Sequence, residues 1–262
     1  MKLRKHMVWA LFLRHLYPLQ RDFDLLSDMI YWPIIDTLLW GVTGQWLAQS
    51  SGGARLVVSI LSGLLLWNVI WRSQAEVARN LMDEIWNNNL VNLFSTPLTI
   101  TEWVVSVILL SIGKTVATVS MLSPIMYLLY RINVLEIGPW LGLFFIGATM
   151  TGWWVGFLAA GIVLRKGPKV QTVIWTLPGI LLPFSAIYFP ITQLPLWARW
   201  ISYLVPTSYI FETMRSVLNG MPVDLTLLLI SFLLNSIYLF FSVWFFVRSF
   251  KYSLNLGLGR FN

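Results

Sequence analysis

The sequence contains no cysteine, which excludes disulfide bonds, thiolate metal sites and a cysteine nucleophile. Charged residues are scarce, at 11% of 262 residues, whereas a soluble domain has about 25%. The two histidines, His6 and His15, lie near the N-terminus, and the chain has no HExxH motif or other metal-ligand cluster. No combination of nucleophile, base and acid can be assembled from the remaining residues. The sequence therefore predicts a protein without catalytic or metal chemistry of its own.

The sequence also lacks a nucleotide-binding motif. A Gly-Lys-Thr triplet occurs at 113–115, but Ile108 occupies the position where a phosphate-binding loop requires glycine. The triplet lies within a hydrophobic span, where the strand that precedes such a loop has no place. Any use of ATP must therefore depend on another protein.

Apolar residues dominate the chain, at 57%, and fifteen of the residues are tryptophan. Several windows of about 20 residues are almost free of charge, which is the length needed to cross a hydrocarbon core of about 30 Å. We therefore predict an all-α membrane protein with a single transmembrane domain over residues 1–262. Its six predicted spans are 29–47, 56–74, 103–130, 139–164, 173–188 and 225–247.

Residues 1–27 are predicted to form a basic amphipathic helix on the membrane surface, followed by a polar elbow. Four basic residues, Lys2, Arg4, Lys5 and Arg14, lie beside apolar ones, and Pro18 is expected to end the helix. Of the eighteen Lys and Arg residues, thirteen fall on one side of the predicted membrane and four on the other. The positive-inside rule then places both termini in the cytoplasm. We read the net charge of +7 as an attraction to anionic lipid and not to nucleic acid.

The stretch 76–97 is the longest polar interruption between two spans, and its periodicity predicts an amphipathic helix. We expect this helix to lie along the cytoplasmic surface, with its polar face available to a partner protein. The apolar face comprises Leu81, Met82, Ile85, Trp86, Leu90, Leu93 and Phe94, and the polar face comprises Asp83, Glu84, Asn87, Asn88 and Asn92.

The connection 189–222 is too apolar for an ordinary external loop, and four prolines divide it into short pieces. It is predicted to form two short helices that dip back into the outer leaflet, with helical faces over 196–204 and 209–217. Glu212 and Arg215, three residues apart on the second helix, are expected to form an ion pair.

Asp36 and Lys114 lie well inside predicted spans, where a charge costs about 2.5–3.5 kcal/mol. They either line a translocation path or serve a structural role, as an ion pair or in a kink made by Pro33. The aromatic residues of the later spans, which include Phe184, Tyr188, Trp197 and Trp200, are typical of an interfacial belt and also suit a stacking surface for substrate.

Two stretches resemble the type-2 ATP-binding-cassette (ABC) exporters. The segment 76–97, with Glu84 and a Phe-Ser-Thr-Pro ending that leads into a span, resembles their cytoplasmic coupling helix. The run 189–215 resembles their external re-entrant helices. The chain departs from the family pattern at Val205, where asparagine is common, and in the Asn-Asn-Asn run at 87–89.

This resemblance implies a permease that contains no cofactor and no metal. Two copies would surround a central path, and two ABC ATPase subunits would bind ATP and Mg²⁺. The implied location is the inner membrane of a prokaryote, in contact with lipid. The coupling residues would be Asp83, Glu84, Asn87, Asn88, Phe94 and Pro97, and the path residues Asp36, Lys114, Phe184, Tyr188, Trp197 and Trp200.

The substrate and the class of transporter remain open at this point. A lipid-linked glycan or polysaccharide and a hydrophobic drug both fit the aromatic outer half. The main alternative function is an ion-coupled secondary transporter without an ATPase, although the two halves of the chain show no paired helix interruptions. A membrane-embedded enzyme and a non-transporting scaffold are weaker alternatives.

Overall fold

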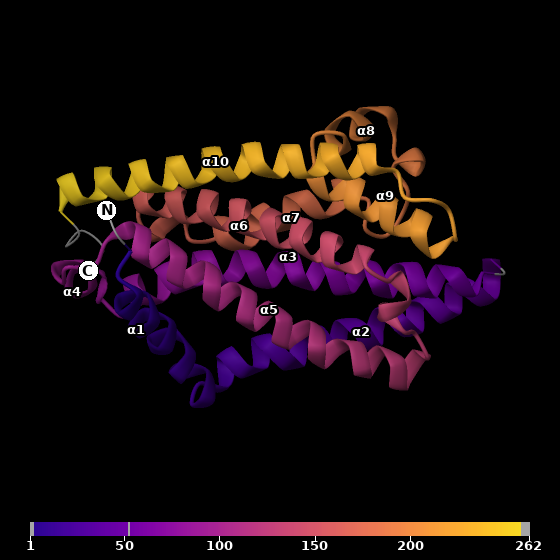
Figure 1. The fold of residues 1–262 in the computed structure, drawn as a ribbon, viewed down its shortest axis with the longest axis horizontal. Coiled ribbons are helices and arrows are strands. Elements are labelled where there is room, and N and C mark those ends of the chain that lie inside the picture. The colour runs from indigo at the N-terminus through magenta and orange to yellow at the C-terminus, as the bar shows by residue number, and fades with distance from the viewer. Residues whose placement is uncertain (1–2, 52, 258–262) are drawn as a thin grey trace.

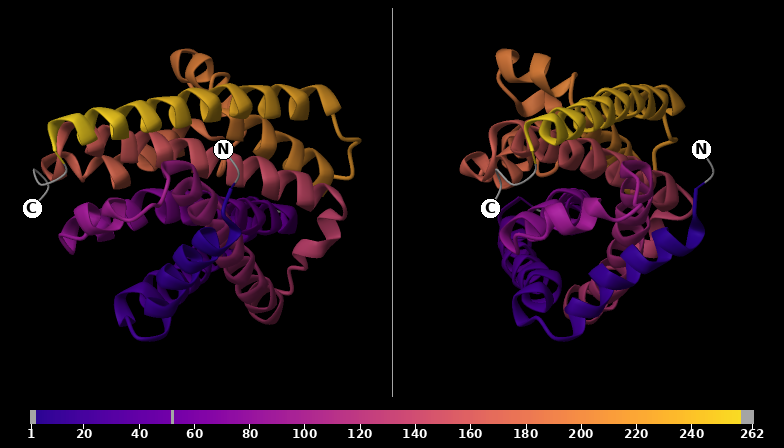
Figure 2. Two further views of the ribbon diagram at one scale, coloured as in Figure 1. Left: turned by 60° about the vertical axis from the view of Figure 1, so that its left-hand side comes forward. Right: turned by 90° about the vertical axis from the view of Figure 1, so that its left-hand side faces the viewer.

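The computed structural model describes residues 3–51 and 53–257, and every regular element in that part of the chain is helical. The all-α class predicted from the sequence is therefore confirmed. The long helices lie side by side in a bundle, with α1 (Lys5–Leu16) set against one flank (Figures 1 and 2). The five long helices are α2 (Phe23–Ser51), α3 (Ala54–Trp86), α5 (Ile100–Tyr130), α6 (Trp140–Lys166) and α10 (Leu225–Leu256).

Four helices of the described part, α3, α5, α6 and α10, are long and apolar enough to cross a membrane. They correspond to the predicted spans 56–74, 103–130, 139–164 and 225–247. Helix α2 contains the predicted span 29–47 and has 29 residues, but it is not among the four. Asp36 and several tryptophan, tyrosine and glycine residues make α2 less apolar than the other long helices.

The fifth predicted span is not a continuous helix. Helix α7 (Val173–Leu181) has nine residues, about 14 Å, and a 3-10 turn at Leu182–Phe184 follows it. The prediction of a single helix over 173–188 is therefore wrong. Proline supplies the physical reason, since Pro178 lies inside α7 and a second proline lies in the turn.

The segment that contains α7 nevertheless runs along most of α3. At one end, the Trp86 indole N–H donates to Gln171 Oε1 at 2.9 Å. Towards the other end, the carbonyl of Ile187 lies against Gly63. Because Trp86 and Gly63 are 23 residues apart on one helix, this segment covers roughly 35 Å along α3.

Helix α6 lies at the centre of the bundle and packs most extensively on α3 and α10. Two glycines, Gly152 and Gly156, allow α6 to approach α3 closely. A Cβ at Gly152 would lie 2.5 Å from the Ile70 carbonyl oxygen, and one at Gly156 would lie 2.8 Å from the Gln74 carbonyl oxygen. Small residues spaced four apart have this function at helix interfaces in membranes.

A buried asparagine joins α6 to α10. The Asn235 side-chain oxygen accepts hydrogen bonds from the Thr151 hydroxyl at 2.8 Å and from the Trp154 indole at 3.2 Å. Its side-chain amide donates to the Gly147 carbonyl at 3.2 Å. Both polar ends of this side chain are therefore satisfied, as the interior of a membrane bundle requires.

Two short helices follow α7, as predicted: α8 (Leu196–Ser202) and α9 (Pro206–Leu218). Helix α9 buries Ile210, Phe211 and Met214 in the core, whereas α8 lies at the periphery of the bundle (Figure 1). The expected ion pair is present, with Arg215 Nη2 3.1 Å from Glu212 Oε1.

The α8–α9 end and the α4 end (Leu90–Ser95) lie at opposite ends of the bundle (Figure 1). Helix α1 begins and α10 ends towards the α4 end. Helices α2, α3, α5 and α6 run in alternating directions, the segment with α7 returns the chain to the α8–α9 end, and α10 then runs parallel to α6 towards the α4 end (Figure 1). Separate clusters of buried apolar residues stabilise the two halves, one around Leu81 and Phe157 and the other around Leu64 and Phe211.

Candidate functional site

The stretch 76–97 does not form the single surface helix expected from its periodicity. Residues 76–86 are the last turns of α3, which continues without interruption to Trp86, and only Leu90–Ser95 form the separate helix α4. Residues 76–86 continue α3 instead of forming a surface helix because several of their polar side chains pair with residues on neighbouring helices. The prediction treated those polar residues as a surface exposed to water.

A compact turn separates α3 from α4. Asn88 adopts a left-handed conformation, with φ of 51°. The N–H of Asn88 donates to the Ile85 carbonyl at 3.0 Å, and the N–H of Asn89 donates to the Glu84 carbonyl at 2.8 Å. This pair of hydrogen bonds defines a Schellman motif, in which asparagine is an accepted alternative to glycine. The turn fixes the position of α4 relative to α3.

Glu84, which was expected on a free polar face, is buried and paired. The two oxygens of its carboxylate accept bonds from Arg14 Nε at 3.0 Å and Arg14 Nη2 at 2.9 Å. The Glu84 side chain is 5% exposed and that of Arg14 is 47% exposed. This bidentate pair attaches α1 to the end of α3.

The other predicted coupling residues differ in their surroundings. Asn87 and Asn88 are exposed, and Asp83 is half-buried. Phe94 packs against Phe250 of α10, with ring centroids 4.5 Å apart. Pro97 is exposed, and its carbonyl oxygen accepts a hydrogen bond from the Arg4 guanidinium.

A second ion pair holds the N-terminal segment to the start of α5. Glu102 and Thr99 form a capping box at the first turn of α5. Arg4 donates to the same carboxylate, from Nε to Oε1 at 2.8 Å and from Nη2 to Oε2 at 2.7 Å, and also to the Pro97 carbonyl. The hydrogen bonds that Arg4 donates to Glu102 raise the pKa of Arg4 above its ordinary value. The N-terminal segment is thus attached through arginine to the end of α3, which precedes α4, and to the start of α5, which follows it.

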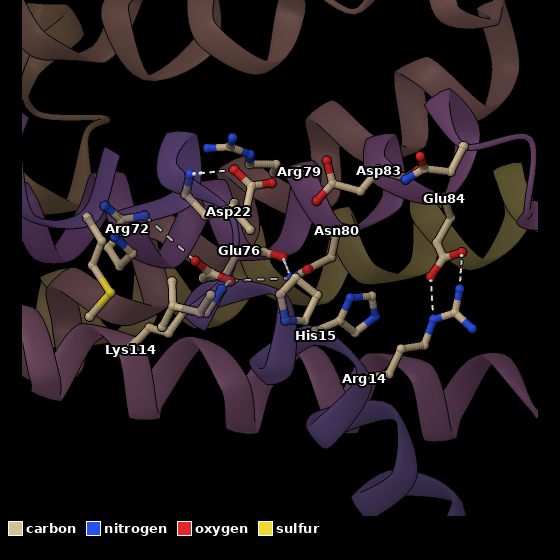
Figure 3. A pocket seen from close by; sticks show the side chains of 15 residues that line it. Arg14, His15, Asp22, Arg72, Glu76, Arg79, Asn80, Asp83, Glu84 and Lys114 are labelled. Atoms are coloured by element: carbon tan, nitrogen blue, oxygen red, sulfur yellow. Dashed lines mark hydrogen bonds and ion pairs between the residues drawn. The ribbon is translucent and has the colours of Figure 1, made fainter. Parts of the chain in front are cut away.

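A polar cavity of about 310 Å³ lies behind these ion pairs, between α1, α2, α3 and α5 (Figure 3). Lys114 enters it from α5, and its Nζ lies 2.7 Å from Glu76 Oε2. Arg72 Nη1 lies 3.7 Å from the other oxygen of the same carboxylate. Lys114 therefore forms an ion pair with Glu76 and not with Asp36.

His15 lies on α1 at this cavity (Figure 3). Burial lowers the pKa of His15 to about 4, and the positive charges of Arg14 and Lys114 act in the same direction, against the opposing effect of Glu84. The imidazole is therefore neutral at neutral pH. Its Nε2 has no hydrogen-bond partner among the described residues.

The first turns of α2 are attached to α3 by one carboxylate. Asp28 Oδ2 accepts bonds from Arg72 Nη1 at 3.0 Å and Arg79 Nη1 at 3.1 Å. Arg72 also donates to the Asp28 carbonyl at 2.6 Å. Helices α1, α2 and α5 are therefore all linked by ion pairs to the half of α3 that leads to α4.

The six predicted path residues lie in different parts of the chain. Lys114 lines the cavity beside α1, whereas Asp36 lines a second cavity between α2 and α3. Tyr188 stacks on Trp40 of α2, with ring centroids 4.3 Å apart. Phe184 meets Trp197 of α8 edge-on at 6.1 Å, and Trp200 is 73% exposed. A single chain therefore does not bring these six residues together in one site.

The sequence reasoning missed the residues that attach these helices to one another. Arg14 and Glu84 are 70 positions apart, and Arg4 and Glu102 are 98 apart, so no local pattern connects them. One local signal was available. The Thr-x-x-Glu spacing at Thr99 and Glu102 is typical of a capping box and predicts the start of α5.

A family model described as ABC-2 type transporter matches residues 6–219, which covers most of the chain. The chain belongs to the ABC-2 type transporter family. No curated protein matches the sequence. The ABC-2 membrane domain is the transmembrane permease and carries no nucleotide-binding domain, in agreement with the sequence. This ABC-2 chain is accordingly a multi-pass membrane protein, and permeases of the family generally pair with an ABC ATPase subunit.

Proposed function

We propose that this chain is the permease subunit of an ABC exporter, which moves an amphipathic substrate outward when a separate ATPase subunit binds ATP and Mg²⁺. The functional complex would contain two copies of the chain and two ATPase subunits. Each chain would cross the inner membrane of a prokaryote six times, with both termini in the cytoplasm. The broken segment that contains α7 and the less apolar α2 would supply the two crossings beyond α3, α5, α6 and α10.

The observation that supports this proposal most strongly is the way α4 is mounted. Helix α4 follows α3 through a fixed turn, and α5 begins five residues after it at a capping box. Exposed amides of Asn87, Asn88 and Asn92 surround the helix and offer donors and acceptors to a partner. A force applied to α4 would therefore act directly on two membrane-spanning helices.

The ion pairs would extend this coupling to the rest of the chain. Arg14–Glu84 and Arg4–Glu102 connect α1 to α3 and to the start of α5, and Asp28 connects α2 to α3. Bidentate arginine–carboxylate pairs resist changes of orientation better than single contacts. Closure of the ATPase subunits would thereby tilt α2, α3 and α5 together.

The exposed face of α2 supports the pairing of two copies. Leu39, Val42 and Trp46 are each more than 60% exposed, although they lie on a helix beside the membrane-spanning α3. A second copy of the chain would cover this face and enclose a path between the two α2 helices. A lipid-linked glycan or polysaccharide and a hydrophobic drug are the candidate substrates.

Reconstitution with the cognate ATPase tests this proposal. The purified chain should hydrolyse no ATP until the ATPase is added, and an arginine at an exposed α4 position (Asn92→Arg) should lower ATP-driven transport by at least tenfold. Asn219→Arg, at an exposed position that follows α9, is the matched control and should leave transport unchanged. ATP hydrolysis by the chain alone, or transport driven by an ion gradient without the ATPase, would reject the proposal.

A further inference from the structure

The second cavity, between α2 and α3, has aromatic walls and a volume of about 370 Å³. Three tryptophans line it, Trp32 from α2 and Trp67 and Trp71 from α3. Its polar residues are Asp28, Asp36 and Asn68. A cavity of this size accommodates a small organic group.

The two carboxylates of this cavity differ in their electrostatic environment. Asp28 accepts bonds from Arg72 and Arg79, so its charge is neutralised. None of the ion pairs formed within residues 3–51 and 53–257 includes Asp36, which is half-buried. The cavity therefore carries one carboxylate without a countercharge.

The position of this carboxylate makes its lack of a partner significant. Trp71 is 17 residues from the first residue of the 33-residue α3, so the cavity lies about halfway along that helix. A charge inside a membrane span, such as Asp36 in the predicted span 29–47, costs about 2.5–3.5 kcal/mol unless a partner or water compensates it. Asp28 shows how this chain satisfies a structural carboxylate, namely with two arginines. Asp36 therefore differs from the structural carboxylates of this protein.

The aromatic surface continues beyond the cavity. Trp71 stacks on Trp175 of α7, with ring centroids 6.2 Å apart. Trp40 lies one turn beyond Asp36 on α2 and stacks on Tyr188. An extended apolar surface thus adjoins an unpaired negative charge in a cavity that three indole rings line.

We propose that this cavity binds the positively charged head of the transported amphiphile, an amine or a quaternary ammonium group. Asp36 supplies the countercharge, and the tryptophans bind the cation through their ring faces. The stacked pairs Trp71–Trp175 and Trp40–Tyr188 contact the apolar part of the molecule. This assignment rests on the proposed export function and narrows its substrate class to cationic amphiphiles.

Binding of two matched lipophilic ions to the purified chain in lipid nanodiscs tests the assignment. Tetraphenylphosphonium and tetraphenylborate have nearly the same size and opposite charge, and each is measured separately by equilibrium dialysis against empty nanodiscs. The cation should bind saturably, and Asp36→Asn should weaken this binding by at least tenfold. Trp71→Leu should weaken it as well, because it removes one wall of the cavity. Asp24→Asn, at an exposed position of the same helix, is the matched control and should bind the cation like the parent protein.

The stability of the variants separates a binding role from a structural one. If Asp36 is an unpaired charge held for a ligand, Asp36→Asn removes its desolvation penalty, and the thermal midpoint should stay equal or rise. A lower midpoint, or cation binding that Asp36→Asn leaves unchanged, would overturn the assignment. Saturable, Asp36-dependent binding of the anion would overturn it as well.

Failure of this inference is distinguishable from failure of the proposed function. The binding assay requires neither ATP nor the ATPase, whereas ATP hydrolysis by the reconstituted complex, with and without Asn92→Arg, is measured without a known substrate. If ATP hydrolysis depends on the partner and responds to Asn92→Arg while the cation does not bind, only the substrate assignment is wrong.

Discussion

Removing either member of the Arg14–Glu84 pair should have unequal effects, because the two side chains differ in burial. Arg14→Met leaves the Glu84 carboxylate, which is 5% exposed, without its cation. Loss of one partner from a buried pair costs about 3–5 kcal/mol, and we expect about 3 kcal/mol here, since the Asn89 side-chain amide still donates to Glu84. Glu84→Gln leaves an arginine that is 47% exposed and readily hydrated, so we expect about 1 kcal/mol.

Hydrogen exchange of the α1 amides measures this difference directly, because the pair holds α1 against α3. A loss of about 3 kcal/mol should speed exchange through local opening on the order of 100-fold, and a loss of about 1 kcal/mol roughly fivefold. Amides in the middle of α10 serve as the internal control and should not change. The double variant should be less destabilised than the sum of the single ones, since neither charge is left alone. Equal effects of the two single substitutions would refute the reasoning from burial.

Three further predictions test other parts of the fold. Gly156→Ala should lower stability by about 2 kcal/mol, because the added Cβ meets the α3 backbone. Gly113→Ala, with nothing within 4 Å of the added Cβ, should raise stability by up to about 1 kcal/mol. Thermal unfolding in detergent measures both, and equal midpoints would contradict the close approach of α6 to α3. Because the pKa of His15 is lowered from 6.5 to about 4, the unfolded chain binds a proton in this range that the folded chain does not. The stability that His15 contributes is therefore complete above pH 6.5 and is lost as the pH falls towards 4, with about 2 kcal/mol lost by pH 5. His15→Gln should flatten this pH dependence, and an unchanged slope would exclude His15 as its source. Asn88→Gly should be tolerated at φ of 51°, whereas Asn88→Val should lower the unfolding midpoint, and equal midpoints would argue against the left-handed turn.

The sequence was sufficient to predict features that depend on local pattern. The charge-poor windows predicted α3, α5, α6 and α10, and the four prolines of 189–222, with helical faces over 196–204 and 209–217, predicted the two short helices α8 and α9. The pair of Glu212 with Arg215 followed from their spacing of three on one helix. Each of these features depends on residues within one or two helical turns of one another.

Features that depend on contacts distant in sequence could not be predicted. The second half of α3 carries Glu76 and Glu84, which a local reading assigns to a surface exposed to water. These residues continue the helix because Lys114 and Arg14 approach them from other helices. Periodicity records which face of a helix is polar, but it does not record whether water or another side chain satisfies that face.

The central claim, that α4 lies on the cytoplasmic side and receives the ATPase, is tested most directly by thiol accessibility. The sequence has no cysteine, so Asn92→Cys and Asn219→Cys each introduce a single reactive site. In intact cells a membrane-impermeant maleimide should label Asn219→Cys and not Asn92→Cys. In inside-out vesicles Asn92→Cys should be labelled, and addition of the ATPase should protect it. Labelling of Asn92→Cys from outside intact cells, or labelling in vesicles that the ATPase does not reduce, would contradict the claim.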